Sequence, residues 1–406
     1  MRHVLFVASK LLFERKRQTI ISIIGVSIGV CAYIVMSSLM FGFQKFFIQQ
    51  VIDIEPHIKI KPKENPIQAS TNELILGYKS EEKDKLMGWQ DLIEEFSKHK
   101  EIKGAAPHLL TRGILKQGIK EKPVNIVGID PLKEAEASVI ERFLKFKNLR
   151  ELESNRMGVI PGILVAKSIG AKDVGDSLLL VLPDGQTLNV KVVDLFDSGI
   201  TNLDDVRVYM HIKTLQGILN KHNQVNEIVF KIQDVNRAEK LARELQQKTE
   251  YEVESWQKAY KNFLSIFKIQ NTITFMIVFA ILVVSSFGIF NIIMMTVLEK
   301  KRDTAILMAL GFMPRDVMLV FLIKGLFIGT IGSLLGVILG YGMQEYLETI
   351  NLDVEGLVRS KGFVLDRDIV HYIYGIAFSF FFSLIASIYP AYRASRLNPV
   401  DIFRSQ

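Results

Sequence analysis

Four long runs of hydrophobic residues divide the chain. They cover residues 20–43, 272–297, 317–341 and 370–389. At a rise of about 1.5 Å per residue, each run can cross the roughly 30 Å hydrocarbon core of a bilayer as a helix. Four runs with almost no ionisable side chain are not typical of buried helices in a soluble protein. The pattern therefore predicts four transmembrane α-helices.

The first run could also be read as a secretory signal peptide, because Arg15, Lys16 and Arg17 precede it. Its hydrophobic stretch is longer than such peptides have, and bulky residues occupy the place of a cleavage site. We therefore interpret it as a retained membrane anchor.

The stretch between the first two runs, residues 44–271, has the pattern of a folded domain outside the bilayer. Alternating or β-branched segments predict strands at residues 57–61, 124–127, 177–182, 188–193, 227–232 and 251–255. Residues 183–186, Pro-Asp-Gly-Gln, predict a hairpin turn, and residues 235–249 an amphipathic helix. The last two strands and this helix form a βαβ-like unit, so we expect an α+β domain.

The distribution of Lys and Arg predicts the orientation. Residues 1–19, the loop at 298–316 and the tail at 390–406 contain twelve Lys and Arg but only five Asp and Glu. Because positive charge stays on the cytoplasmic side, both termini are expected in the cytoplasm, with residues 1–19 forming an interfacial head. The loop at 342–369 then lies outside with the large domain. The net charge of +7 thus reflects membrane topology and does not indicate nucleic-acid binding.

The sequence lacks the motifs of common catalytic sites. No Gly-Lys dipeptide occurs, which excludes a Walker A loop, and no His-Glu-x-x-His motif occurs. The seven histidines are scattered, and the single cysteine, Cys31, lies within the first hydrophobic run. We therefore expect no catalytic residues, no metal and no directly bound cofactor, and the chain is not expected to be an enzyme.

Two features of the hydrophobic runs indicate helix contacts. Lys324 is the one charged side chain well inside a run, and the favoured interpretation is pairing within a helix bundle. Small residues recur at spacings of three and four, which predicts close helix packing within a bundle or a dimer. They are Ser22, Gly25 and Gly29 in the first run and Gly325, Gly329, Gly332 and Gly336 in the third.

The loop between the second and third runs predicts a short amphipathic helix that ends at a glycine. It begins with charged residues and continues with an apolar ridge that could dock a partner. The candidate docking residues are Glu299, Lys300, Arg302, Asp303, Ala305, Ile306, Leu307, Leu310 and Gly311.

This loop resembles the pattern E-K-x-R-x-x-A-I-L-x-A-L-G of the FtsX-like permease superfamily of ABC transporters. The resemblance extends to Gly42-Phe43, Glu55-Pro56-His57-Ile58, Gly128-Ile129-Asp130-Pro131, Gly162-Ile163-Leu164-Val165-Ala166 and Val174-Gly175-Asp176, and to the C-terminal segment from Tyr389 to Val400. Within the superfamily the chain looks most like the lipoprotein-releasing subunits of the LolC/LolE family.

The resemblance implies a MacB-like periplasmic core domain and a place in the bacterial inner membrane. It implies a permease subunit that releases lipoproteins from the outer leaflet, with a second permease, the same or a paralogous chain, and a cytoplasmic ABC ATPase dimer that uses ATP. The docking residues named above then form the coupling helix that contacts the ATPase. Membrane lipid is a further partner.

Three functions remain open at this stage. The first is lipoprotein release. The others are export of another amphiphile in the manner of MacB, and regulation of cell-wall hydrolases in the manner of FtsX. The hairpin at residues 183–186 is shorter than the hook with which LolC-like subunits recruit a periplasmic lipoprotein carrier, which leaves carrier binding open.

Overall fold

The computed structural model describes residues 7–8, 10, 16–63, 85–147, 149–171, 173–350, 353–355, 359–398 and 402. Most of the predicted interfacial head and the tail beyond residue 398, apart from residue 402, lie outside these residues. The chain divides into two compact units. The helical unit comprises Met1–Lys45, Ile266–Leu352 and Lys361–Gln406. The other unit, which we name the extracytoplasmic unit after its predicted location, comprises Phe46–Ser265 and Asp353–Ser360.

Four long helices in the described chain are apolar and long enough to cross a membrane. They are α2 (Lys16–Ile54), α12 (Lys261–Glu299), α14 (Pro314–Thr349) and α15 (Ile369–Ser395). This confirms the predicted four transmembrane helices, although α2, α12 and α14 extend well beyond the hydrophobic runs. In α2 nothing interrupts the helix until Pro56, whose ring disfavours helical geometry at the preceding residue.

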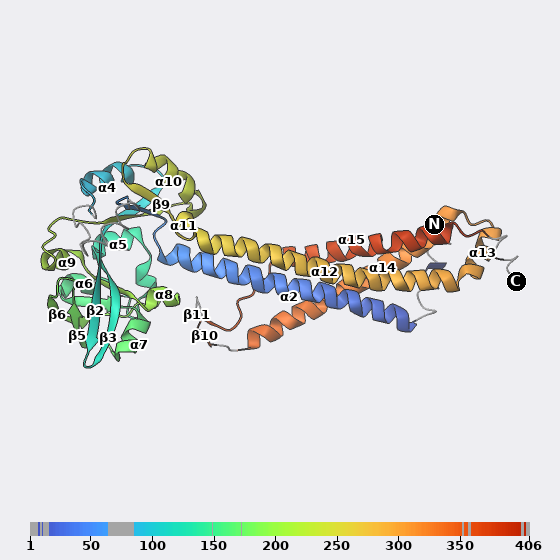
Figure 1. The fold of residues 1–406 in the computed structure, drawn as a ribbon, viewed down its shortest axis with the longest axis horizontal. Coiled ribbons are helices and arrows are strands. Elements are labelled where there is room, and N and C mark those ends of the chain that lie inside the picture. The colour runs from blue at the N-terminus through green and yellow to red at the C-terminus, as the bar shows by residue number, and fades with distance from the viewer. Residues whose placement is uncertain are drawn as a thin grey trace, which may run out of the picture. The chain divides into compact units, whose positions relative to one another are not determined.

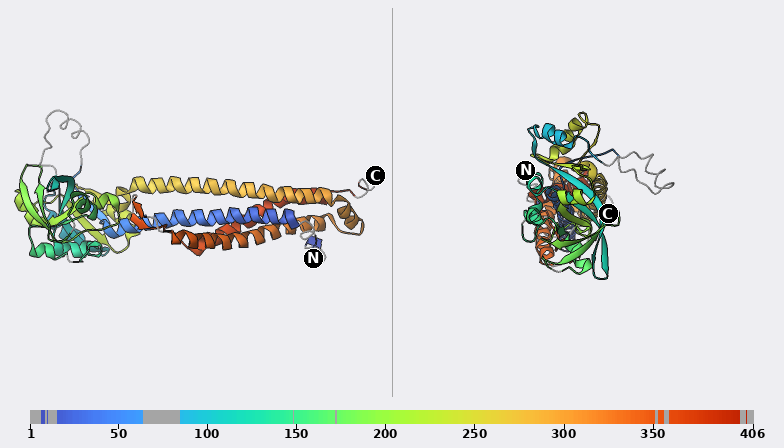
Figure 2. Two further views of the ribbon diagram at one scale, coloured as in Figure 1. Left: turned by 90° about the horizontal axis from the view of Figure 1, so that it is seen from below. Right: turned by 90° about the vertical axis from the view of Figure 1, so that its left-hand side faces the viewer.

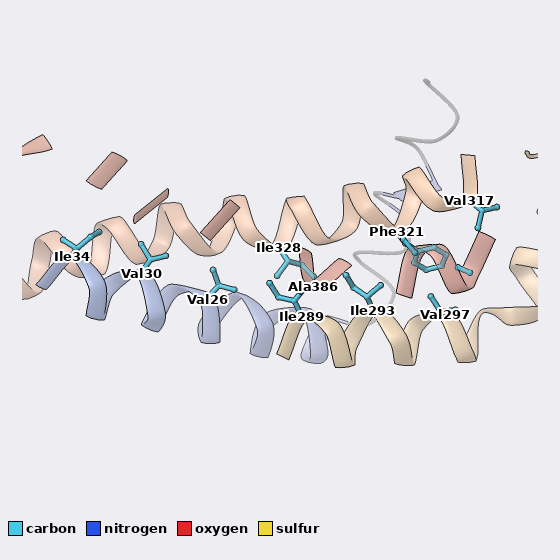
Figure 3. Packing of buried hydrophobic residues seen from close by; sticks show 12 residues of the cluster. Val26, Val30, Ile34, Ile289, Ile293, Val297, Val317, Phe321, Ile328 and Ala386 are labelled. Atoms are coloured by element: carbon cyan, nitrogen blue, oxygen red, sulfur yellow. The ribbon is translucent and has the colours of Figure 1, made fainter. Parts of the chain in front are cut away.

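The helices of the helical unit pack along one another, as two perpendicular views show (Figures 1 and 2). Their common core is a seam of β-branched and aromatic side chains (Figure 3). Val26 and Val30 of α2, Ile293 of α12 and Phe321 of α14 are each at most 3% exposed. The outward faces carry large exposed apolar residues, as expected for helices surrounded by lipid.

The extracytoplasmic unit contains a mixed sheet of nine strands. They are β1 (Ile58–Lys61), β2 (Ile102–Gln117), β3 (Lys120–Ile129), β4 (Gly158–Pro161), β5 (Ser177–Val181), β6 (Thr187–Val192), β7 (Arg207–His211), β8 (Glu227–Ile232) and β9 (Glu252–Ser255). The strand order is β3-β7-β4-β6-β5-β2-β8-β1-β9, and β2 also pairs with β3. The first six strands therefore close into a ring.

Strand β2 belongs to both parts of this sheet. Its first half pairs with β8, from Ile102 to His108, and its second half pairs with β3, from Leu109 to Gln117. The second part, β2-β8-β1-β9, is antiparallel throughout. Because β1 lies between β8 and β9, the predicted βαβ-like unit is present in a split form.

Short helices connect and cover these strands (Figure 1). In α10 the side chains of Leu241 and Leu245 are buried. The helices are α4 (Trp89–Ser97), α5 (Pro131–Ala137), α6 (Glu151–Ser154), α7 (Ile163–Ile169), α8 (Thr201–Asp204), α9 (Ile212–Ile218), α10 (Ala238–Gln246) and α11 (Trp256–Ala259), with 3-10 turns η2 (Ile140–Phe143) and η3 (Val235–Arg237). Two short strands, β10 (Asp353–Glu355) and β11 (Arg359–Lys361), pair with each other. The α+β prediction is confirmed.

Candidate functional site

The segment between α12 and α14 folds as the short helix α13 (Lys301–Ala309). It ends in two hydrogen bonds, from the Gly311 amide to the Met308 carbonyl (3.1 Å) and from the Phe312 amide to the Leu307 carbonyl (3.1 Å). This arrangement requires a residue with left-handed backbone conformation directly after the helix, and Gly311 has a φ of +101°. The glycine therefore fixes the turn by which the chain leaves α13 and enters α14.

The predicted apolar ridge of α13 is divided between two environments. Ala305 is fully buried, whereas Ile306 is 41% and Leu310 is 76% exposed. Ala305 therefore packs within the unit, and a coupling role for it stays a prediction. Met313, which sequence reasoning missed, is 66% exposed. The accessible apolar surface consists of Ile306, Leu310 and Met313.

The charged residues of the predicted set lie around the start of α13. Lys300 forms an exposed ion pair with Asp303 at 2.9 Å, and Arg302 is exposed. An exposed pair of this kind contributes at most about 1 kcal/mol to stability. Its side chains are available to a partner, and a coupling role for Glu299, Lys300, Arg302 and Asp303 stays a prediction.

Lys324 is almost completely buried inside the helical unit, at 1% exposure. Its ammonium group donates a hydrogen bond of 2.9 Å to the hydroxyl of Thr296 on α12. The Thr296 hydroxyl in turn donates to the Ile292 carbonyl. Lys324 thus links α14 to α12, in agreement with a contact within the bundle.

The glycine row of α14 contacts two different helices. Gly332 and Gly336 lie against Val26 and Val30 of α2, whose Cβ atoms are 2.7 Å from the points where glycine β-carbons would stand. A separation below 3.0 Å leaves no room for a side chain, so the glycines permit close approach of the two helices.

Gly325 and Gly329 instead lie against Ser387 and Ser383 of α15. The predicted small-residue row therefore joins α14 to two neighbours along its length. On α2, Gly29 lies against Ser285 of α12.

Ser22 and Gly25 of α2 differ in their surroundings. Ser22 is buried, but a β-carbon on Gly25 would meet nothing within 4 Å. Packing of Gly25 against a second permease remains a prediction.

An apolar cavity of about 400 Å³ lies among α2, α12 and α15. Its walls are mainly aromatic and aliphatic side chains, with a few hydroxyl and amide groups. They are Tyr33, Ser37, Met40, Phe41, Asn271, Thr274, Phe275, Val278, Phe279, Leu282, Phe378, Phe381 and Phe382. This volume is within the range of small-molecule binding pockets, and its chemistry suits a hydrocarbon chain. The hydrophobic runs in the sequence do not predict such a cavity, because most apolar residues in a membrane helix face lipid or other helices.

A polar cluster lies beside this cavity. The Nδ1 of His371 is 2.9 Å from the Ser37 hydroxyl, and its Nε2 is 3.1 Å from the Asp366 carboxylate. Lys45 forms an ion pair with Asp366 at 2.6 Å. Burial alone would raise the pKa of Asp366, but Lys45 and His371 outweigh it and lower that pKa.

The same cluster fixes the backbone that leads into α15. The Asp366 amide donates to the Ser38 carbonyl at 2.9 Å, and Gly42 lies directly against the Val364 carbonyl. Ser37, His371 and Asp366 contact one another in the order of a Ser-His-Asp hydrolytic triad. A triad also needs free backbone amides to bind an oxyanion, and the amides around Ser37 are already hydrogen-bonded within a continuous helix. We interpret Ser37, His371, Asp366 and Lys45 as a polar clasp that holds residues 363–368 against α2.

The extracytoplasmic unit contains a second buried ionic group. Arg207 is 2.8 Å and Lys59 is 2.6 Å from the carboxylate of Glu55, which is buried. Burial alone would raise the pKa of Glu55, but the two cations outweigh it and hold that pKa well below its usual range. Glu55 therefore stays ionised and joins α2 to β1 and β7.

His108 of β2 continues this group. It is 2.7 Å from Glu134 and 3.3 Å from Glu227, and all three are buried. Burial alone would lower the pKa of His108, but the two carboxylates outweigh it and raise that pKa to about 9. The imidazole is thus protonated at neutral pH. Within the described residues, no three His, Cys, Asp or Glu side chains are grouped to hold a metal ion.

Two protein-family models match the chain. The MacB-like periplasmic core domain matches residues 19–248, more than half of the chain, and the FtsX-like permease C-terminal domain matches residues 275–399. The chain belongs to the FtsX-like permeases with a MacB-like core domain. This confirms the family resemblance based on the α13 segment and the flanking motifs.

Curated relatives cover nearly the full length of the permease. The lipoprotein-releasing system transmembrane protein LolC of Xylella fastidiosa (strain 9a5c) is 28% identical, over 94% of this chain and 92% of that protein. LolC of Neisseria meningitidis serogroup B is 26% identical, over 95% of this chain and 94% of that protein. LolE of Haemophilus influenzae is 24% identical, over 95% of this chain and 93% of that protein.

Among solved structures, the periplasmic region of MacB from Actinobacillus actinomycetemcomitans aligns at a TM-score of 0.34 and 14% identity, over 52% of this chain and 95% of that chain.

The permease is therefore a multi-pass membrane protein of the ABC transporter permease family. The relatives above are named as transmembrane proteins of lipoprotein-releasing systems, and the second family model is that of a permease.

Proposed function

We propose that the permease releases lipoproteins from the outer leaflet of the bacterial inner membrane, as a subunit driven by a separate cytoplasmic ABC ATPase. The observation that carries the proposal is the near full-length similarity to lipoprotein-releasing transmembrane proteins in several bacteria. In this arrangement both termini are cytoplasmic, the permease pairs with a second permease, and ATP is bound by the ATPase alone.

The energetics of release require shelter for the acyl chains. Exposing lipid chains to water costs about 0.8 kcal/mol per CH₂, which amounts to tens of kcal/mol for a triacylated protein. We assign one sheltering surface to the apolar cavity among α2, α12 and α15. A hydrocarbon chain in this cavity would remain in contact with Phe275, Phe279 and Phe382 as it leaves the leaflet.

The accessible surface of α13 supports coupling to the ATPase. Ile306, Leu310 and Met313 are apolar and exposed at the end of the unit predicted to be cytoplasmic. A short helix held between two spanning helices can transmit a push on this surface to α12 and α14. The ATPase dimer is the partner we assign to it.

The proposal is tested by co-purifying the permease with its candidate ATPase and second permease and measuring ATP hydrolysis with added triacylated lipoprotein. We expect lipoprotein to stimulate hydrolysis severalfold. A stable complex that responds only to other amphiphiles would replace lipoprotein release by general export.

A variant pair connects this activity to the cavity. Thr274 lines the cavity, and Thr274→Phe fills part of it. Ile273 precedes it on the same helix, is 52% exposed and does not line the cavity, so Ile273→Phe is the matched control. Thr274→Phe should lower stimulation by lipoprotein at least fivefold, whereas the control should retain it.

A further inference from the structure

Two buried polar side chains, Ser38 on α2 and Gln344 on α14, lie at the end of the helical unit that is predicted to be extracytoplasmic. Both are 0% exposed. Neither the Ser38 hydroxyl nor the Gln344 Nε2 has a hydrogen-bond partner among the residues that the structure describes. Buried polar atoms without a partner are rare in native proteins, because each loses its bonds to water without replacement. These two atoms therefore need a ligand.

The packing of α2 on α14 places Ser38 opposite Gln344. The seam between the helices is made of three contacts at intervals of four residues, which are Val26 with Gly332, Val30 with Gly336 and Ile34 with Gly340. Figure 3 shows the three α2 side chains in a row on one face of that helix. Ser38 and Gln344 follow four residues later, about one turn further along each helix. The nearest α2 atom is 2.7 Å from the β-carbon position of the first two glycines and 3.2 Å from that of the third, so the helices separate toward this end.

The chain around the start of α15 contacts both residues. The Asp366 amide donates to the Ser38 carbonyl at 2.9 Å, and the Tyr372 hydroxyl donates to the Gln344 Oε1 at 2.5 Å. A distance this short is found for O–H···O bonds and not for N–H···O bonds, which confirms that Gln344 turns its oxygen toward Tyr372. The amide nitrogen of Gln344 is thus the atom left for another partner.

We propose that one buried water molecule bridges Ser38 and Gln344. Its oxygen accepts a hydrogen bond from the Gln344 Nε2, and one of its hydrogens is donated to the Ser38 hydroxyl oxygen. An amide N–H repels a cation, and the carboxylate of the neighbouring Asp366 repels an anion, so the site favours a neutral ligand. A neutral molecule that both donates and accepts within a fully buried site is water. The bridge joins α2 to α14 at the point where direct glycine packing ends.

A structure of the full permease in lipid nanodiscs, at a resolution that shows ordered water, tests the bridge directly. We expect one density peak at about 2.7–3.2 Å from both the Ser38 hydroxyl oxygen and the Gln344 Nε2. No density between the two ordered side chains, or a direct hydrogen bond between them, would overturn the proposal. The wild-type structure decides the question even where a variant does not fold.

A double-mutant cycle tests whether the two side chains act through the same water. Ser38→Ala and Gln344→Met each remove one polar partner, and each should lower the transition temperature of thermal unfolding in detergent by about 2–4 °C. Either substitution leaves the opposite group without its bridge, so the double variant should lose clearly less than the sum of the two shifts. Fully additive shifts would reject a shared water.

The control cycle combines Gln344→Met with Ser333→Ala. Ser333 is also buried on α14, but its hydroxyl donates to the Thr330 carbonyl at 2.9 Å within the same helix. These two shifts should add, because no bridge joins the positions. An equal lack of additivity in the control would mean that the cycle reports a general loosening of α14, and would reject the bridge.

Discussion

The Cβ of Val26 on α2 lies 2.7 Å from the point where a β-carbon on Gly332 of α14 would stand. Gly332→Ala should therefore push the two helices apart and destabilise the helical unit by about 1–3 kcal/mol. Gly342→Ala on the same helix meets nothing within 4 Å and should be neutral or stabilise by up to about 1 kcal/mol, because alanine favours helix. Thermal unfolding in detergent, followed by helical circular dichroism, compares the two. Equal transition temperatures would show that α2 and α14 do not pack this closely.

The clasp around His371 predicts local mobility when it is broken. His371→Ala leaves the buried Ser37 hydroxyl and the Asp366 carboxylate without this partner, which costs about 1–3 kcal/mol. Amide exchange of residues 363–368, measured by mass spectrometry, should accelerate at least tenfold. Arg367→Gln removes exposed ion pairs with Glu345 and Glu348 and should change exchange little. Equal amide exchange rates in His371→Ala and Arg367→Gln would show that the clasp does not hold this segment.

His108 predicts a pH dependence of the extracytoplasmic unit. Its pKa is about 9 in the folded protein and about 6.5 when unfolded. Below pH 6.5 both states are protonated and the stabilisation is complete. Above that pH the unfolded state loses its proton first, so the stabilisation declines and is lost as the pH rises past 9. The difference corresponds to about 3 kcal/mol.

Tryptophan fluorescence measures this effect selectively, because both tryptophans of the chain, Trp89 and Trp256, belong to the extracytoplasmic unit. The urea midpoint of the full permease in detergent should fall between pH 6.5 and 9.5. His108→Gln should be less stable at pH 6.5 and lose most of this pH dependence, whereas His222→Gln, at an exposed position, should retain it. An unchanged pH profile in His108→Gln would contradict the assigned protonation.

The exposed apolar surface of α13 predicts a defect in coupling without a defect in folding. Ile306→Ser combined with Leu310→Ser should reduce lipoprotein-stimulated ATP hydrolysis at least tenfold and weaken co-purification of the ATPase. Lys301→Ser, at an exposed position of the same helix, serves as control and should retain most activity. Full stimulation in the double variant would exclude this surface as the docking site.

The sequence predicts the parts of this fold that depend on local pattern. The spanning helices follow from long hydrophobic runs, and β8 was predicted with its observed bounds because residues 227–232 are dense in β-branched and aromatic residues. Strand β2 was missed because Gly104 and Pro107 interrupt its pattern, and its 16 residues are stabilised by strands from two parts of the sheet. Its existence depends on tertiary pairing, which a local pattern does not contain.

The candidate functional residues could likewise be predicted only in part. The glycine that ends α13 and the buried Lys324 were evident from the sequence, because each breaks the composition around it. The burial of Ala305 and the pairing of Ser37 with His371 were not. These residues are brought to their neighbours by the packing of helices far apart in the chain.

The central claim is tested most directly by reconstituting the permease with its ATPase and second permease in proteoliposomes that carry a fluorescent triacylated lipoprotein. Release of the lipoprotein to a soluble lipid-binding acceptor is measured after ATP addition. The account predicts ATP-dependent release by the wild type and by Ile273→Phe, and at least fivefold slower release by Thr274→Phe. No ATP-dependent release from an active, ATP-hydrolysing complex would contradict it.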